Sequence, residues 1–376
     1  AQCLVGSEMC IRDRLYNLLI YVMKILLITV RSDFGGGPRH VDQLINNLPQ
    51  NIEIYVAYPQ DGTPYGQEWN SNSRIKSRIN IPFRKFSTKT LFEIAKFIKE
   101  NSINIVHSHG NGAGVYSRLL PLLGVDSKIV HTFHGISEFY SCKAKKIIDK
   151  LSGVVLKYFT DAFVLVSYGE LELGQNRRIL FKNKSQVIYN GIEDPHRLAE
   201  RKEDKVVTIS RFNYQKNMDS SFAIASAFKQ DNSIRFVWVG DGDDYSRLKQ
   251  QAEKECINIE FVGFSINPME HLCNSSIYLS TSRFEGLPYA LIEAAAIGLP
   301  IIASDVKGNN EVVMHGFNGY LFHTIEEGIG YIEKLHKDRV LSERMSRFSR
   351  TFYEDNFTIN KMIDALVSVY DKLNFL

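Results

Sequence analysis

The sequence contains few cysteines and no long apolar run, and each absence excludes a class of protein. Its five cysteines are scattered without C-x-x-C spacing, and three of them, an odd number, lie outside residues 1–22. This argues against a disulfide framework and against a zinc site, so we expect a reducing compartment. The first apolar stretch is broken by Lys24, which argues against a membrane-spanning helix.

Two further absences concern sequence motifs. No internal repeat and no low-complexity segment is present, so we expect no repeat architecture. The chain also lacks G-x-G-x-x-G followed by an acidic residue, the pattern that binds a dinucleotide. A Rossmann dehydrogenase is therefore disfavoured.

The composition is that of a globular protein with two domains. The chain has 376 residues, of which 44% are apolar and 23% charged. Its net charge of +3 hides an asymmetry, because residues 24–200 contain 23 Lys and Arg against 16 Asp and Glu, whereas the rest from Arg201 contains 20 against 24. A basic first half suits an anionic membrane surface or a charged acceptor, and ordinary solubilising charge is the alternative.

Residues 1–22 need a separate explanation. The stretch 4–14, LVGSEMCIRDR, resembles the translation of a sequencing-library adapter. Leu15–Val22 imitates a signal peptide but is followed by no A-x-A-like cleavage site. We therefore predict that residues 1–22 are an artefactual or disordered leader and that the native chain begins near Met23.

The first half alternates buried strands with helices. Ile25–Val30 is a continuously apolar run, followed by the glycines 35–37, by Pro38 and by a helical pattern over Val41–Leu48. This pattern predicts a buried parallel strand, a glycine turn and a helix that opens with proline. The order predicts a parallel sheet covered on both faces, with ligands beyond the carboxyl ends of its strands. Similar units follow, with strands at 52–57, 103–107, 128–132 and 161–167 and helices at 90–99 and 115–123.

Four histidines fall at the ends of these strands. His107 ends one expected strand and His109 follows it, and His131 and His134 lie at the end of another. Imidazole is a common metal ligand, but no acidic residue or cysteine is spaced to complete a site, so we predict no metal here. His107 and His131 have the alternative role of ordinary strand-end residues.

Ser141–Tyr158 carries five lysines together with apolar residues at helical spacing. A basic amphipathic helix of this kind can lie on anionic lipid, and a solvated charged face is the alternative. Exposed aromatic side chains would favour lipid, and the candidates are Tyr140, Tyr158 and Phe159.

The second half repeats the pattern after a charged segment. Its first expected strand leads into Arg211 and Lys216, which stand five positions apart across a loop and can converge on one dianion. Solubilising surface charge is the alternative. Strands are expected at 206–209, 234–239, 259–264, 277–280 and 300–303, and helices at 218–228, 245–255 and 359–373.

The most informative stretch is RFEGLPYALIE, residues 283–293. Glu285 lies on a loop, and Glu293 follows eight positions later in a helical run with Pro288 at its first turn. One carboxylate on a loop and another on a helix can bind the two ends of one ligand. Gly286 allows close approach to the backbone, and the free N–H groups of the turn attract a phosphate. A solvated loop acid and a helix-surface charge are the alternative.

This stretch resembles a known signature. F-E-G-L-P-x-x-x-I-E is similar to the E-x7-E signature of the retaining glycosyltransferases of family 4, which have the GT-B fold. The resemblance implies an α/β architecture with two Rossmann-like, doubly wound parallel-sheet domains that face each other across a cleft. It also implies a C-terminal helix that crosses back to the first domain. We place the acceptor-binding domain, the linker, the nucleotide-sugar-binding domain and the crossing helix at 23–192, 193–204, 205–355 and 356–376.

The resemblance also implies roles for single residues. Glu285 would hold donor-sugar hydroxyls and Glu293 the nucleotide ribose. Arg211 and Lys216, in SRFNYQKN, would grip the diphosphate, and His134, the last histidine of HTFHG, would lie near the reacting sugar. The candidate catalytic residues are therefore His134, Arg211, Lys216 and Glu285. Further donor-binding candidates are Gly36, Gly37, Gly240, Gly242, Phe264, Gly286, Leu287 and Pro288. Acceptor-side candidates are Arg39, His40 and His109, and Glu311 is either a site residue or a first-turn helix acid.

The implied function is hexosyl transfer with retention of configuration. The donor would be a nucleotide-diphosphate sugar, first of all a UDP-sugar, and the acceptor a glycan or a lipid-linked glycan in bacterial surface polysaccharide synthesis. Arg211, Lys216 and helix N-termini would replace a metal, so we expect no cofactor. We expect no nucleic-acid partner and a cytoplasmic location, peripheral on the inner face of the membrane. The alternatives are a nucleotide-sugar epimerase with the GT-B fold and a non-catalytic membrane-associated scaffold.

Overall fold

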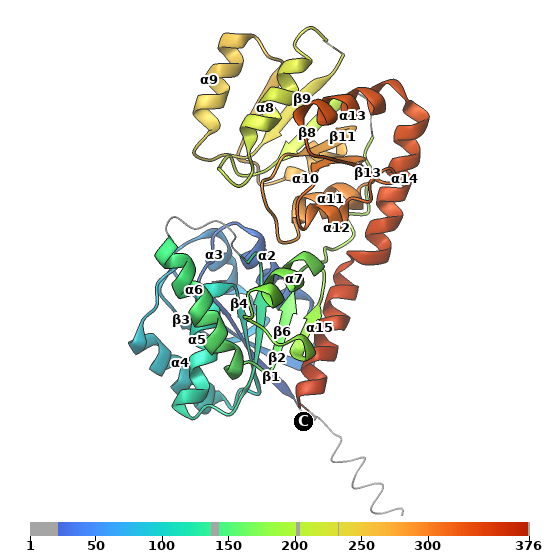
Figure 1. Ribbon diagram of the computed structural model, residues 1–376. Helices are drawn as coiled ribbons and strands as arrows, with labels where there is room; N and C mark the ends of the chain where they lie inside the picture. Colours follow the sequence, from blue (N-terminus) through green and yellow to red (C-terminus); the bar gives the residue numbers. More distant parts are fainter. Residues whose placement is uncertain (1–21, 137–142, 201–203, 232, 375–376) are drawn as a thin grey trace, which may run out of the picture. The chain divides into compact units, whose positions relative to one another are not determined.

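The computed structural model describes residues 22–136, 143–200, 204–231 and 233–374. The predicted leader, apart from Val22, and the lipid-contact candidate Tyr140 therefore lie outside the described residues. Two parallel β-sheets with helices around them organise the rest (Figure 1). This confirms the predicted α/β fold with two doubly wound, Rossmann-like domains.

The first sheet has seven strands in the order β3-β2-β1-β4-β5-β6-β7. Its central strand β1 pairs in parallel with β2 and β4, and its apolar side chains are buried on both faces. The strands are β1 (Met23–Thr29), β2 (Ile52–Tyr58), β3 (Ile75–Asn80), β4 (Ile105–His109), β5 (Lys128–Phe133), β6 (Ala162–Leu165) and β7 (Ser185–Val187). The α-helices between them are α2 (Gly36–Asn47), α3 (Pro64–Ser71), α4 (Thr88–Asn101), α5 (Asn111–Leu119), α6 (Lys143–Leu156) and α7 (Tyr168–Asn176).

The second sheet has six strands in the order β10-β9-β8-β11-β12-β13. Alternate residues of one strand enter different apolar clusters, since Ile301 packs with helix α11 and Ile302 packs with Trp238. Both faces of this sheet are therefore covered. The strands are β8 (Lys205–Ile209), β9 (Arg235–Val239), β10 (Ile259–Gly263), β11 (Ile277–Ser280), β12 (Ile301–Ser304) and β13 (Gly319–Phe322). The helices are α8 (Met218–Ala227), α9 (Tyr245–Glu255), α10 (Pro268–Cys273), α11 (Tyr289–Ala296), α12 (Asn309–Val312), α13 (Ile325–Lys337), α14 (Arg339–Asn356) and α15 (Ile359–Asn374).

The last helix, α15, returns to the first of two compact units. Of the described residues, that unit comprises those up to Thr132, Leu156–Ala162 and those from Val369 to Asn374, and the second unit comprises the others. The Tyr370 hydroxyl of α15 lies 2.6 Å from Nδ1 of His107 on β4, so the end of the chain is joined to the core of the first sheet. Within the described ranges, none of the helices combines the length and the apolar character needed to cross a bilayer.

Candidate active site

Two loops meet at the carboxyl edge of the second sheet. Strands β8 and β11 are parallel neighbours, so the loops that follow them, 210–217 and 281–288, leave the sheet at the same edge. The Thr281 hydroxyl donates to the carbonyl of Lys216 at 3.1 Å, and the N–H of Arg283 donates to the carbonyl of Gln215 at 2.8 Å. These bonds bring together residues that lie 65 and 68 positions apart.

Lys216 and Glu285 form an ion pair where the two loops touch. Nζ of Lys216 lies 2.5 Å from Oε1 of Glu285, and only 21% and 7% of the two side chains are exposed. Nε2 of Gln215 donates to the other carboxylate oxygen at 3.3 Å. The lysine predicted to hold a diphosphate and the acid predicted to hold a sugar are therefore in direct contact. A donor whose diphosphate lies beside Lys216 would also contact Glu285.

Two glycines fix the loop that carries Arg211. At Gly240, with φ of +133°, a Cβ atom would lie 1.9 Å from the carbonyl oxygen of Ser210. At Gly242, with φ of +152°, it would lie 2.5 Å from that of Phe212. Both positions require glycine because the turn after β9 packs directly on the backbone that flanks Arg211. Phe212 is fully buried, whereas Arg211 is exposed beside it.

Phe264 directly follows strand β10, the neighbour of β9 in the sheet, and is 57% exposed. It follows Gly263, whose carbonyl accepts the N–H of Gly240 at 2.8 Å. The turn at Gly240 and the donor-binding candidate Phe264 are thus adjacent. A small pocket opens at the ends of β8 and β11, and Lys216, Thr281 and Pro288 are among the residues that line it. Its hydroxyl and ammonium groups can bind a polar, anionic ligand.

Helix α11 places the second acid of the signature. Pro288 has φ of −77° and ψ of 121°, so it is extended and precedes the helix as its N-cap residue instead of lying in its first turn, and the helix begins at Tyr289 as predicted. Glu293 lies in the second turn and is 7% exposed. The carbonyl of Leu287 accepts the Asn190 side chain at 2.9 Å, and Gly308 approaches the carbonyl of Gly286 so closely that a Cβ there would lie 2.4 Å away. The backbone before α11 is therefore held in place on two sides.

Glu170 is a candidate site residue that sequence reasoning missed. It is the third residue of α7, is 3% exposed and accepts the N–H of Ile136 at 2.9 Å. A Cβ added to Gly286 would lie 3.1 Å from the same carboxylate oxygen. Burial raises the pKa of this carboxyl group to about 8, although backbone N–H groups lower it. Glu170 thus lies between the segment that follows His134 and the loop of the signature.

The sequence did contain a signal for Glu170, but the signal indicates a different role. Ser167 and Glu170 stand in the S-x-x-E spacing of a capping box, and the Ser167 hydroxyl does accept the N–H of Glu170 at 3.2 Å. In a capping box the glutamate would return to the backbone of the serine. Here the carboxylate instead accepts the N–H of Ile136, which is 34 positions away, and no local pattern shows that partner.

Glu311 is a first-turn helix acid with distant hydrogen-bond partners. It lies in the first turn of the short helix α12, and its carboxylate accepts the N–H of Tyr168 at 2.7 Å and that of Gly169 at 2.8 Å. These are N–H groups of the first turn of α7, which have no partner inside that helix. Glu311 therefore caps α7 from a distant part of the chain.

The histidines of the first sheet fall into two groups. His107 and His131 are fully buried and bonded, His107 to Tyr370 and to Thr132 at 2.7 Å, and His131 to Ser108 at 2.9 Å. Burial lowers the pKa of His107, which keeps it neutral. These two side chains have a structural role, which is the alternative given for them above.

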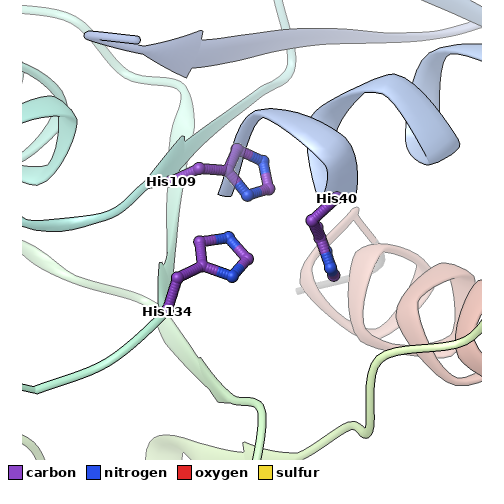
Figure 2. Close-up of side chains that lie close together, drawn as sticks. All are labelled: His40, His109 and His134. Atoms are coloured by element: carbon purple, nitrogen blue, oxygen red, sulfur yellow. The ribbon is translucent and has the colours of Figure 1, made fainter. Parts of the chain in front are cut away.

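The second group comprises His40, His109 and His134 (Figure 2). Their ring nitrogens lie within 4.8 Å of one another, His40 and His109 being buried and His134 half-buried. The register of the sheet explains one contact, because His109 on β4 pairs with Thr132 on β5 and His134 leaves β5 at the same edge. Three nitrogen donors at this spacing match a metal site as well as a hydrogen-bonding cluster. The metal site weighed from the sequence included His109 and His134 but not His40.

His40 is a buried residue in the second turn of α2. The helix starts at Gly36, two residues before the proline that the sequence predicts to open it, so Pro38 lies inside the first turn, where a helix tolerates proline. Gly36 and Gly37 are therefore the first helical residues and not a loop. Arg39 donates its N–H to the carbonyl of Gly35 at 3.0 Å. The N-terminus of α2 can still present N–H groups to an anion.

The two halves of the chain match models of known protein families. Residues 34–195 match Glycosyltransferase Family 4, and residues 192–352 match Glycosyl transferases group 1. Together with the two Rossmann-like sheets, these matches show that the chain is a glycosyltransferase with the GT-B fold.

Particular relatives extend this result. The O-antigen biosynthesis glycosyltransferase WbnH of Escherichia coli is 27% identical over 336 residues, 88% of this chain and 95% of that protein. An Escherichia coli UDP-Gal:alpha-D-GlcNAc-diphosphoundecaprenol alpha-1,3-galactosyltransferase is 28% identical over 308 residues, 75% of this chain and 79% of that protein. Among solved structures, Anabaena Alr3699/HepE in complex with UDP and glucose has a TM-score of 0.79 at 16% identity, covering 93% of this chain and all of that one. This last likeness concerns the fold.

Proposed function

We propose that this glycosyltransferase moves a hexose from a UDP-sugar to a lipid-linked or free glycan of a bacterial surface polysaccharide, with retention of configuration. The observation that carries the proposal is the contact between Lys216 and Glu285, because it unites a diphosphate-binding cation with a sugar-binding acid at one sheet edge. The relatives named above act in O-antigen synthesis or use UDP-galactose and a diphosphoundecaprenol acceptor, which supports this donor and acceptor class.

In the proposed reaction the diphosphate leaves while the acceptor arrives on the same face of the sugar. The bond from C1 to the phosphate oxygen breaks, a bond from C1 to the acceptor oxygen forms, and the acceptor proton passes to the departing phosphate oxygen. Arg211 and Lys216 stabilise the charge that develops on the phosphate. Glu285 holds the sugar hydroxyls, and Glu293 binds the ribose. His134 hydrogen-bonds to the sugar without bringing a fixed charge.

The proposed reaction needs no metal, since two cationic side chains and helix N-termini act on the diphosphate. Metal independence can be tested sharply, because the cluster of His40, His109 and His134 could hold a metal ion. Turnover should be unchanged in EDTA and should not rise with added manganese. Activity that is lost in EDTA and returns with manganese would assign a metal to the reaction.

The proposed location is the cytoplasm, with peripheral contact to the inner face of the membrane through the basic first half of the chain. A lipid-linked acceptor resides in that membrane, so the enzyme must meet its substrate there.

The test of the reaction is proton NMR of the products formed from UDP-sugars and a lipid-diphosphate glycan acceptor. The proposal predicts release of UDP and an anomeric coupling constant in the product that matches the donor. Inversion of that coupling would contradict retention. Conversion of the donor into an epimer without any acceptor would instead favour the epimerase.

A further inference from the structure

Helix α6 presents large apolar side chains to its surroundings. Ile147, Ile148, Leu151 and Val155 are 57%, 66%, 61% and 59% exposed. Their spacing places all four within one arc of the helix, about 100° wide. We call them the α6 stripe. Tyr158, in the 3-10 turn that follows the helix, is 67% exposed.

Residues of α6 beside and opposite the stripe are packed. Val154, at the margin of the stripe, lies against the cluster that contains Phe133, Phe163 and Ile179. Gly153 fits so closely that a Cβ atom there would lie 2.7 Å from a methyl group of Ile179. The helix therefore cannot roll to bury its stripe without losing this packing. A helix covered only by water normally has polar residues on its outer face, so the stripe points to a further partner.

The charge around the stripe indicates the kind of partner. The segment 143–157 contains five lysines and a single acid, Asp149. Lys150 is exposed between the apolar positions, and the ammonium group of Lys157 lies 5.4 Å from the ring centre of Tyr158. Apolar side chains beside lysines match the boundary between acyl chains and anionic headgroups of a bilayer. A second copy of this chain is a poorer partner, because a symmetric contact would bring two lysine-rich segments together.

We propose that the α6 stripe is the surface by which this enzyme docks on an anionic bilayer, with the apolar side chains entering the headgroup region. This proposal rests on the proposed function, because it names the helix that would bring the enzyme to a lipid-linked acceptor. Vesicle binding can be measured without donor or acceptor, so the docking surface can be tested separately from the reaction.

The first experiment is flotation of the full chain with vesicles of phosphatidylcholine, with or without phosphatidylglycerol. We expect binding to the mixed vesicles only, and a loss of at least about tenfold in Ile148→Glu. The matched control is Ile266→Glu, because Ile266 is 91% exposed before α10 and the chemical change is the same. Lys150→Glu should lower binding by roughly tenfold or more, and Lys249→Glu on α9 should not.

Absence of wild-type binding to the mixed vesicles, equal binding to both kinds of vesicle, or wild-type binding by Ile148→Glu would each overturn the proposal. Thermal melts establish that the variants are folded. Sedimentation velocity tests whether the stripe is instead a protein interface. In that case Ile148→Glu would change the oligomeric state while vesicle binding persists.

The second experiment reports insertion directly. Both native tryptophans, Trp69 and Trp238, are fully buried, so Leu151→Trp adds a reporter in a different environment. Its emission should shift to shorter wavelength when phosphatidylglycerol vesicles are added. An emission spectrum that does not change, in a variant that floats with the vesicles, would contradict insertion of the stripe.

Discussion

The carboxyl edge of the second sheet and helix α6 of the other half differ in what holds them. At the sheet edge, backbone hydrogen bonds, glycine contacts and the Lys216–Glu285 pair leave little freedom. Helix α6 is packed on one face and presents apolar side chains on the other. The proposed diphosphate site is therefore held in place by backbone contacts. The proposed membrane-docking surface, in contrast, consists of side chains on one face of a helix.

The largest effect is expected where the backbone leaves no room. Gly240→Ala would place a Cβ atom 1.9 Å from the carbonyl oxygen of Ser210, and the φ of +133° adds strain. We expect a loss of more than about 4 kcal/mol of unfolding free energy, or failure to fold, in urea denaturation. Gly330→Ala on α13 is the control, because no atom lies within 4 Å of its Cβ position, and it should be neutral or stabilising by up to ~1 kcal/mol. Equal stability of Gly240→Ala and the wild type would refute the fixed-backbone account.

The next effect concerns turnover. Lys216→Ala and Glu285→Ala should each lower kcat by roughly a hundredfold or more, because the charge on the departing diphosphate and the position of the sugar depend on them. The double variant should be little worse than either one, since the two side chains act as a unit. Lys337→Ala, which breaks an exposed pair with Glu333, is the control. Additive losses in the double variant would show that the ion pair has no role in catalysis.

Glu170 should make stability depend on pH. Its pKa is raised from 4.5 to about 8 in the folded protein, so between these values the folded state keeps a proton that the unfolded state has lost. Its contribution to stability must therefore decrease as the pH rises from about 5 to 8. Glu170→Gln should remove this decrease, measured by urea unfolding at both pH values, and the exposed Glu172→Gln on the same helix should retain it. Parallel pH profiles of wild type and Glu170→Gln would show that the raised pKa is wrong.

The smallest effect is expected at the distant cap of α7. Glu311→Ala removes the carboxylate that accepts the N–H groups of Tyr168 and Gly169, so we expect a loss of ~1 kcal/mol in thermal unfolding. Glu326→Ala, an acid in the first turn of α13 for which no such distant contact is seen among the described residues, is the comparison and should cost less. A larger loss for Glu326→Ala would reverse the assignment of the cap.

The sequence predicted the elements whose physics is local. Apolar, β-branched runs such as Ile25–Val30 mark buried parallel strands, and the fold followed from their alternation with helices. Strand β3, IKSRIN, was not predicted because an edge strand with charged residues lacks that pattern. Helix α3 and strand β13 were missed as well, both being short.

The candidate site could be predicted only in part, for a similar reason. Arg211 and Lys216 stand in one compact motif and Glu285 in another, so each motif could be placed on a loop, and the structure brings Lys216 to Glu285. The contact of Glu170 with Ile136 and the group of His40, His109 and His134 depend on how strands pair and where helices begin. Those are properties of the folded chain and not of any local spacing.

The most direct test of the central claim is a thermal-shift titration of the full chain with UDP, GDP, ADP, CMP and NAD, with and without EDTA. The account predicts stabilisation by UDP, about 2.7 kcal/mol at a hundredfold excess over its Kd, which persists in EDTA. The shift should disappear in Arg211→Ala and remain in Lys249→Ala, which changes an exposed lysine of α9. A shift with NAD alone, or with none of these nucleotides, would contradict the assignment of the second sheet edge to a nucleotide-diphosphate sugar.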